Sequence, residues 1–230
     1  NTPVTVLEDE SFQREYEEIT YDPYGFERYL EDVLRLEAVA CKDWLTNKVD
    51  RSVTGKVATQ QTCGPLQLPL NNVGVVARDY ISKRGMATAI GHAPVAGLID
   101  SRAGSVLSIA EALTNIVWAP IAGGLSGISL SANWMWPAEN PGENARLYKA
   151  VEAAAGFANA LGINIPTGKD SLSMKQRYPE KKVVAPGTVI ISATGEVTDI
   201  TKTVEPVLQE EEGSELYYIR FGDPGFALGG

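Results

Sequence analysis

Residues 167–175, read T-G-K-D-S-L-S-M-K, bring together side chains that could bind a phosphorylated ligand. Lysine ammonium groups and serine hydroxyls donate to phosphate oxygens, and Gly168 would let the backbone come close to such a ligand. The spacing does not fit a P-loop, because Ile163 stands where the first glycine is needed and Asp170 follows Lys169. The segment is therefore either a phosphate-binding segment of another kind than a P-loop or a polar strand end that faces solvent.

A second chemical signal lies in residues 101–118, where the apolar spacing predicts a helix. Glu111 and Asn115 are four residues apart, so they share one face of that helix, and Gly104 and Ser108 continue the stripe toward its amino end. A carboxylate and an amide oxygen can ligate one Mg²⁺, and small residues beside them would leave room for waters and phosphates. From the pair alone, an ordinary solvated helix face is the favoured interpretation.

The composition is that of a globular chain. Its 230 residues are 44% hydrophobic and 21% charged, which suits one substantial core. The net charge of −9 argues against a nucleic-acid partner. No apolar run approaches the roughly 20 residues of a membrane span, so no membrane partner is expected, and residues 1–18 do not resemble a secretory signal. Cys41 and Cys63 are too few for a disulfide framework and suggest reduced thiols in a cytoplasmic protein.

The apolar periodicity predicts a mixture of helices and strands. Three helices are expected. The first covers 26–45 and breaks near residue 36, the second covers 101–118 with Asp100 or Ser101 as its cap, and the third covers 143–161 and ends at Gly162. The strands expected are 73–77, 86–90, 128–135, 188–194 and 215–221. This order predicts an α/β or α+β core. We divide the chain into an acidic, helical lead-in at 1–49, a central domain at 50–206, and a linker with the start of a further domain at 207–230.

Several further motifs, taken together with residues 167–175, carry a family resemblance. They are R-S-V-T-G at 51–55, C-G-P-L-Q-L-P at 63–69, G-H-A-P at 91–94, E-A-L-T-N at 111–115 and L-S-A-N-W-M at 130–135. In this order and with similar gaps they resemble the large, single-chain phosphoribosylformylglycinamidine synthases, which are glutamine-dependent ligases of purine biosynthesis. The matched stretch is similar to the amino-terminal half of the second of two aminoimidazole-ribonucleotide-synthetase-like modules.

The resemblance implies an α+β fold in which a mixed sheet packs against helices. It implies a part in converting formylglycinamide ribonucleotide, glutamine and ATP into formylglycinamidine ribonucleotide, glutamate, ADP and phosphate. The implied partners are the first synthetase-like module, which would pack against the sheet of this one, and a separate glutaminase domain. Two alternatives stay open: a scaffold module that holds Mg²⁺ and nucleotide without turnover, and another superfamily member such as selenophosphate synthetase, which matches less of the chain.

The resemblance also implies a site for Mg²⁺ and ATP or ADP, with no catalytic residue in this piece. Glu111, Asn115 and Asn72 correspond to metal ligands, and Asn71 corresponds to a nucleotide contact. The other nucleotide-binding residues expected are Lys169, Asp170 and Ser171. Asn72 departs from the family pattern, where an aspartate is typical, so it offers an amide oxygen without the charge that attracts a cation. An Asn-Asn turn before a buried strand is a second interpretation of Asn71 and Asn72.

Three further expectations concern single features. His92, the one histidine, could be a general base, but a loop or satisfied histidine is favoured because the sequence offers it no partner. Residues 134–136, Trp-Met-Trp, could stack on an adenine, although such residues beside a strand more often belong to the core. Without its partner module the sheet would expose an apolar face, so self-association of the chain is expected.

Overall fold

A six-stranded sheet forms the body of the computed structural model, which describes residues 4, 6–7, 20–36, 39–41, 51, 55–209 and 211–219. In spatial order the strands are β1 (Val57–Thr59), β2 (Val73–Ala77), β3 (Gly85–His92), β8 (Thr188–Val197), β4 (Ile128–Met135) and β5 (Asn164–Ser171). Neighbouring strands are antiparallel except β4 and β5, which are parallel. The sheet is therefore mixed, as expected.

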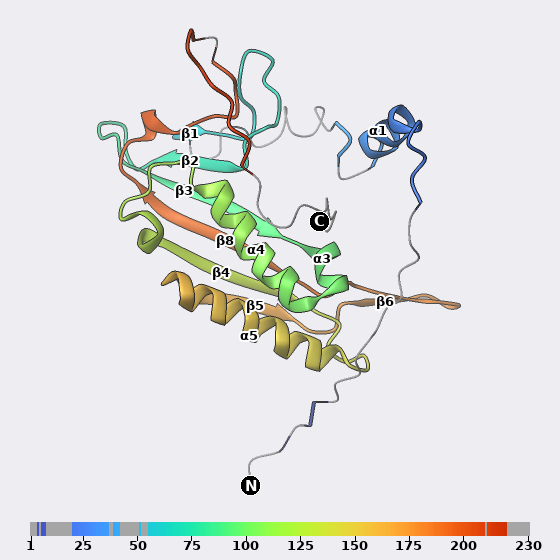
Figure 1. Ribbon diagram of the computed structural model, residues 1–230. Coiled ribbons are helices and arrows are strands. Elements are labelled where there is room, and N and C mark those ends of the chain that lie inside the picture. Colours follow the sequence, from blue (N-terminus) through green and yellow to red (C-terminus); the bar gives the residue numbers. More distant parts are fainter. Residues whose placement is uncertain are drawn as a thin grey trace.

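Helices form the second layer, on one face of the sheet (Figure 1). They are α3 (Pro94–Ile99), α4 (Ser101–Ile116) and α5 (Glu143–Leu161); α4 packs against β3 and β8, and α5 packs against α4. Besides these layers, α1 (Phe26–Leu34) buries none of its residues, and β6 (Lys175–Arg177) pairs with β7 (Lys182–Val184) in a small hairpin. Two short 3-10 turns lie at Gly124–Gly127 and Ile200–Lys202. A mixed sheet packed against helices confirms the expected α+β class.

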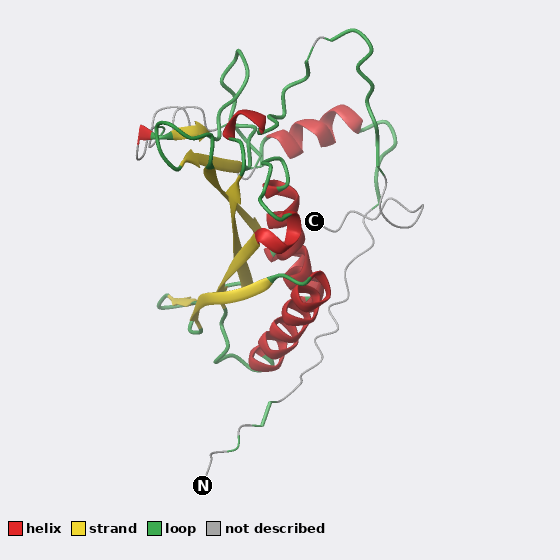
Figure 2. Cartoon of the chain, turned by 90° about the vertical axis from the view of Figure 1, so that its left-hand side faces the viewer, coloured by secondary structure: helices red, strands yellow, loops and turns green. Residues whose placement is uncertain are grey.

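Alternating side chains decide which face of the sheet the helices cover. Along β8 every second residue is buried, from Val189 to Val197, and β3 follows the same alternation. The buried face meets a stripe on α4, formed at helical spacing by Ile109, Ala112, Leu113 and Ile116. The core lies between these two layers, and the opposite face of the sheet carries no helix of the described chain (Figure 2).

Small residues allow α4 to approach its neighbours closely. A Cβ added at Gly91 in β3 would lie 2.2 Å from the carbonyl oxygen of Ser108, and one added at Gly104 would lie 2.5 Å from the Cα of Gly97. Ser108 is completely buried, and its Oγ donates to the carbonyl of Gly104. The expectation that Gly104 and Ser108 leave room for a ligand is therefore wrong, because β3 and α3 fill that space.

The start of α4 and the end of α5 are where their sequences predict them. The Asp100 side chain caps α4 by accepting from the backbone N–H of Arg102 at 2.8 Å and from that of Ala103. Gly162 ends α5 with φ +69°, a left-handed conformation that glycine adopts without steric cost. Four alanines of α5 are buried toward the core side: Ala145, Ala150, Ala154 and Ala158.

The observed elements differ from the predictions in several places: β3, β8 and α4 have other bounds than expected, and β1, α3, β6 and β7 were not expected. Of the helix expected at 26–45, residues 26–34 are helical, the described residues 35–36 and 39–41 are turns and irregular backbone, and 42–45 lie outside the described residues. The strand expected at 215–221 is absent from its described part, 215–219. β5 was not among the strands expected from periodicity, but it agrees with the interpretation of residues 167–175 as a polar strand end, because residues 167–170 are exposed in it. The division into 1–49, 50–206 and 207–230 stays a prediction.

Candidate functional site

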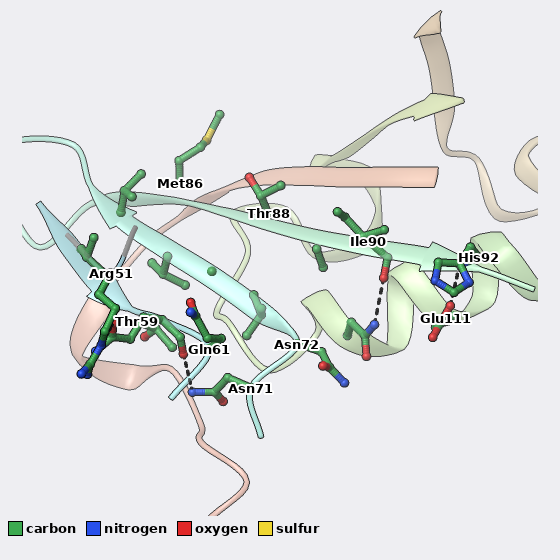
Figure 3. A pocket seen from close by; sticks show the side chains of 18 residues that line it. Arg51, Thr59, Gln61, Asn71, Asn72, Met86, Thr88, Ile90, His92 and Glu111 are labelled. Atoms are coloured by element: carbon green, nitrogen blue, oxygen red, sulfur yellow. Dashed lines mark hydrogen bonds between the residues drawn. The ribbon is translucent and has the colours of Figure 1, made fainter. Parts of the chain in front are cut away.

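A pocket of about 590 Å³ brings together four of the residues expected at a nucleotide site. Asn71 and Asn72 reach it from the segment that leads into β2, and Glu111 and Asn115 reach it from α4 (Figure 3). The remaining lining comes mainly from β1, β2 and β3. Residues about 40 positions apart in the sequence therefore lie around one cavity, as the family resemblance implied.

The pocket forms where β2 and β3 part. Their last pair is Val73 with Ala89, whereas β3 continues to His92 alongside β8. Ile90 and His92 therefore have no strand partner among the described residues on the β2 side of β3. Both residues direct their backbone N–H and carbonyl groups toward that side. Two side chains of α4 take the place of a strand: Asn115 Nδ2 donates to the Ile90 carbonyl at 2.9 Å, and the His92 N–H donates to Glu111 Oε2 at 2.5 Å.

These hydrogen bonds orient the two side chains toward a possible ligand. Because the Nδ2 group of Asn115 donates to the Ile90 carbonyl, its Oδ1 atom remains available to accept a hydrogen bond from a ligand or to coordinate a metal ion. Glu111 uses Oε2 on His92, so its second carboxylate oxygen is left in the same way. Asn72 makes no side-chain hydrogen bond with the described residues and lines the same pocket. Three side-chain oxygens of Asn72, Glu111 and Asn115 are thus available around one cavity.

Oxygen donors of this kind fit Mg²⁺, which prefers carboxylate, carbonyl and water oxygens. The set carries one negative charge, on Glu111, so waters or phosphate oxygens would complete the coordination. Within the described residues no cluster of three or more His, Cys, Asp or Glu side chains could hold a metal ion. A cation site in this part of the chain therefore depends on amide oxygens as well as on Glu111.

Asn71 fixes the wall of the pocket opposite α4. Its side chain is 7% exposed, Nδ2 donates to the Gln60 carbonyl at 2.9 Å, and its backbone N–H donates to the Gln61 carbonyl at 3.0 Å. These bonds tie the entry to β2 to the residues after β1. They leave Asn71 Oδ1 as the polar atom that a ligand could use.

Arg51 lines the pocket as well, and the sequence pointed to it only as the first residue of the R-S-V-T-G motif. Its NH2 group donates to Thr62 Oγ1 at 3.1 Å and to Gln67 Oε1 at 2.8 Å. Gln67 itself has φ +51°, unusual for a residue with a side chain, and its backbone N–H donates to the Gly64 carbonyl. This network, together with the bond from Arg51 Nε to Gln60 Oε1, holds the guanidinium group at the pocket wall.

The phosphate-competent motif lies elsewhere on the sheet. Lys169, Asp170 and Ser171 belong to β5, which β4 and β8 separate from β3, and none of them lines the pocket. Lys169 Nζ donates to Ser171 Oγ at 3.1 Å. Gly168 serves close strand packing, because an added Cβ would lie 2.0 Å from the Ala132 carbonyl oxygen of β4. The structure therefore does not bring these three residues to Asn72, Glu111 and Asn115.

The remaining expected features have clear positions. His92 ends β3 and lines the pocket with an exposed side chain. Trp136 is 1% exposed and its Nε1 donates to the Glu143 carbonyl at 2.9 Å, which confirms the interpretation as a core residue. Both cysteines are free thiols, Cys63 buried and Cys41 exposed. Among the described residues no helix is long and apolar enough to cross a membrane.

Curated relatives match most of this chain. The human phosphoribosylformylglycinamidine synthase is 49% identical over 202 residues, which are 87% of this chain and 15% of that protein. A probable phosphoribosylformylglycinamidine synthase of Caenorhabditis elegans is 45% identical over 193 residues, or 84% of this chain and 14% of that protein. The chain thus spans about one seventh of the length of these relatives.

A solved structure and a family model agree with these matches. PurLQS from Thermotoga maritima is similar with a TM-score of 0.51 and 18% sequence identity, covering 72% of this chain and 25% of that one, which shows the shared fold. The model of the FGAR-AT PurM_N-like domain matches residues 41–196, more than half of the chain. These residues include β1 to β5 and most of β8. The chain therefore belongs to the FGAR-AT PurM_N-like domain family.

Proposed function

We propose that this chain is part of an ATP- and glutamine-dependent ligase that converts formylglycinamide ribonucleotide into formylglycinamidine ribonucleotide. The names of relatives 45–49% identical to it support this activity. Its local task, in this proposal, is to hold a Mg²⁺–nucleotide complex. The observation that carries the proposal is the convergence of Asn72, Glu111 and Asn115 on one pocket, each with a side-chain oxygen left for a ligand.

The division of labour in this site follows from charge and orientation. The carboxylate of Glu111 would attract the cation, and the amide oxygens of Asn115 and Asn72 would complete the protein's share of its ligands. A Mg²⁺ ion held by these residues would neutralise part of the charge on the nucleotide's phosphates. The bonds from Asn115 to Ile90 and from His92 to Glu111 hold both ligands at fixed positions before anything binds. Such preorganisation lowers the entropic cost of binding.

Within the ligase, we propose that this module mainly holds its nucleotide as a scaffold. Two observations favour this role over turnover. Asn72 contributes no charge where the family resemblance leads us to expect an aspartate, and Glu111, the one carboxylate among the described residues that line the pocket, already accepts from the backbone of β3. The partners proposed are the other synthetase-like module and the glutaminase domain.

A titration of the chain with ADP tests this function. Calorimetry with Mg²⁺ should detect binding that excess chelator removes. Glu111→Gln should weaken Mg²⁺-dependent binding by at least about tenfold, because the cation loses its charged ligand. Glutamine keeps an oxygen that can accept from the His92 N–H, so the local structure should survive, as circular dichroism can check.

Glu152→Gln is the matched control, since Glu152 is exposed on α5 and does not line the pocket. It should leave ADP affinity unchanged. ADP binding that ignores Mg²⁺, or that is the same for Glu111→Gln and the unmodified chain, would contradict the proposed site.

A further inference from the structure

The small hairpin of β6 and β7 projects away from the six-stranded sheet (Figure 1). We call residues 175–184, which form it, the basic ribbon. Residues 175–182 read K-Q-R-Y-P-E-K-K, so four cationic side chains stand against one carboxylate and give a local charge of +3, whereas the whole chain carries −9. Residues 176–184 are all exposed. The ribbon is therefore a basic surface on an acidic chain.

The strand register of the ribbon places two like charges opposite each other. Arg177 on β6 pairs with Lys182 on β7. The N–H of Tyr178 donates to the Lys181 carbonyl at 2.7 Å, so the adjacent pair of Arg177 and Lys182 is of the kind without mutual hydrogen bonds, in which side chains lie closest. Like charges directly opposite each other weaken a ribbon. An anionic partner placed against Arg177 and Lys182 would remove this repulsion.

The nearby carboxylate of Glu139 acts mainly on another ribbon residue. Glu139 forms an ion pair with Lys175, and this contact, with a smaller contribution from Arg177, holds the pKa of the Glu139 carboxyl below its ordinary value. Lys182 Nζ donates to Asn140 Oδ1 at 2.8 Å, which is an uncharged acceptor. These contacts fasten the ribbon to the segment before α5. Within the part of the chain that the structure describes, Arg177 and Lys182 form no ion pair.

The position of these cations favours a macromolecular surface over a small ligand. Ribbon residues line neither the 590 Å³ pocket nor the smaller cavities of about 210 and 390 Å³. Two exposed cations on a narrow ribbon instead match two carboxylates that stand close together on a partner.

A polypeptide suits the ribbon better than a nucleic acid does. Bases stack on open aromatic faces, but Lys181 Nζ lies 5.5 Å from the centre of the Tyr178 ring, the one aromatic ring of the ribbon. The overall charge of −9 would also repel a long polyanion. A short acidic segment meets only the ribbon and avoids most of this repulsion.

We propose that the basic ribbon is a docking surface for an acidic segment of another polypeptide, whose carboxylates accept from Arg177 and Lys182. The planar guanidinium of Arg177 can donate two parallel hydrogen bonds to one carboxylate, and Lys182 can bind a neighbouring one. Val183 and Val184, 50% and 38% exposed, offer apolar contact beside these charges. Because the ribbon is not part of the 590 Å³ pocket, this surface is independent of the proposed nucleotide site.

The test titrates the chain into a short, fluorescently labelled oligoglutamate and measures anisotropy. The unmodified chain should bind at low ionic strength, and added salt should weaken the complex. Arg177→Gln/Lys182→Gln should weaken it about tenfold, since both contacts lose their charge. Arg177→Glu/Lys182→Glu should abolish it. In urea unfolding the glutamine variant should be at least as stable as the unmodified chain, because it removes a like-charge pair.

Arg102→Gln/Lys202→Gln is the matched control, since it removes the same charge from two exposed residues outside the ribbon. It should leave the affinity for oligoglutamate unchanged. No binding by the unmodified chain, or equal losses in the glutamine variant and the control, would overturn the docking surface. Tighter binding of an oligothymidylate of equal charge, lost in Arg177→Gln/Lys182→Gln, would overturn the choice of a polypeptide and indicate a nucleic acid.

Discussion

Glu111 and Asn115 each combine a structural contact with a free oxygen. Their side chains satisfy backbone groups of β3 at His92 and Ile90, and the same bonds decide which of their oxygens stays available. Their spacing suggested a polar helix face, and the family resemblance implied a metal site. The two interpretations are compatible, because each side chain can bond to β3 and still offer one oxygen to a cation. A substitution at either residue should be designed to preserve the contact with β3, because otherwise a loss of binding could reflect a loss of local structure.

Asn72 provides a gain-of-function prediction at the residue scale. Asn72→Asp adds a second negative charge to the donor set, so Mg²⁺–ADP should bind about tenfold more tightly, or roughly 1.4 kcal/mol. Asn159→Asp is the control, since Asn159 is exposed on α5 and adds the same charge away from the pocket. Calorimetry with and without Mg²⁺ measures both. Equal affinity for Asn72→Asp and the unmodified chain would show that Asn72 does not contact the cation.

Among the elements, the approach of β3 to α4 sets the geometry of the site. An added Cβ at Gly91 would lie 2.2 Å from the Ser108 carbonyl oxygen and 2.3 Å from the Ala112 nitrogen, and both are backbone atoms that cannot rotate away. Because Gly91 lies between Ile90 and His92, this contact holds their backbone groups within reach of Asn115 and Glu111. Close packing here thus supports the proposed site.

Gly91→Ala should therefore destabilise the chain. Forcing a methyl group into this contact should lower the free energy of unfolding by about 1–3 kcal/mol. Gly156→Ala is the control, because Gly156 lies exposed in α5 with no atom within 4 Å of an added Cβ. That change should raise stability by about 0.4–1 kcal/mol. Urea unfolding measures both, and a Gly91→Ala chain as stable as the unmodified one would show that β3 and α4 are not packed this closely.

The sequence predicted local elements better than their assembly. β2 has the bounds expected from its β-branched run, and α4 begins at the expected Asp100 cap. The state of residues 167–175 stayed open between a phosphate-binding segment and a polar strand end, because Pro166, Gly168 and Asp170 have low strand propensity. Pairing with β4 overrides that propensity and makes residues 164–171 a strand. Strand order could not be predicted, so the motif at 167–171 was expected at the site although two strands separate β5 from β3.

Small residues were also ambiguous from sequence alone. The spacing of Gly104 and Ser108 on one helix face has two possible explanations. Small residues there can leave room for a ligand, or they can allow a neighbouring element to pack closely. The structure shows close packing against α3 and β3. By contrast, the family resemblance placed Asn71, Asn72, Glu111 and Asn115 together, because the order and spacing of several motifs carry information about the fold that composition lacks.

For the whole molecule, the main feature is the face of the sheet that no described helix covers (Figure 2). Apolar side chains on it include Val76, Met86 and Ile90, which are 38–53% exposed and also line the pocket that contains Asn72, Glu111 and Asn115. Exposed apolar surface of this kind favours association, either with another module or with a second copy of the chain.

Self-association at micromolar concentration is therefore expected in sedimentation experiments. Ile190, on β8, lies on the uncovered face beside His92, so Ile190→Lys should weaken association at least about tenfold by burying an unpaired charge. Val151→Lys is the control, because Val151 is exposed on α5 in the helical layer. A concentration-independent monomer, or equal effects of both substitutions, would show that this face does not mediate association.

The central claim is that Asn72, Glu111 and Asn115 hold one cation that carries a nucleotide. Crystals of the chain grown with ADP and Mn²⁺, which also takes oxygen ligands, locate that cation through its anomalous scattering. We predict one anomalous peak in the 590 Å³ pocket. It should lie at bonding distance from side-chain oxygens of Asn72, Glu111 and Asn115 and from the phosphates of ADP. A peak at the Lys169–Ser171 end of β5, or ADP bound in the pocket with its cation away from Glu111, would contradict the claim.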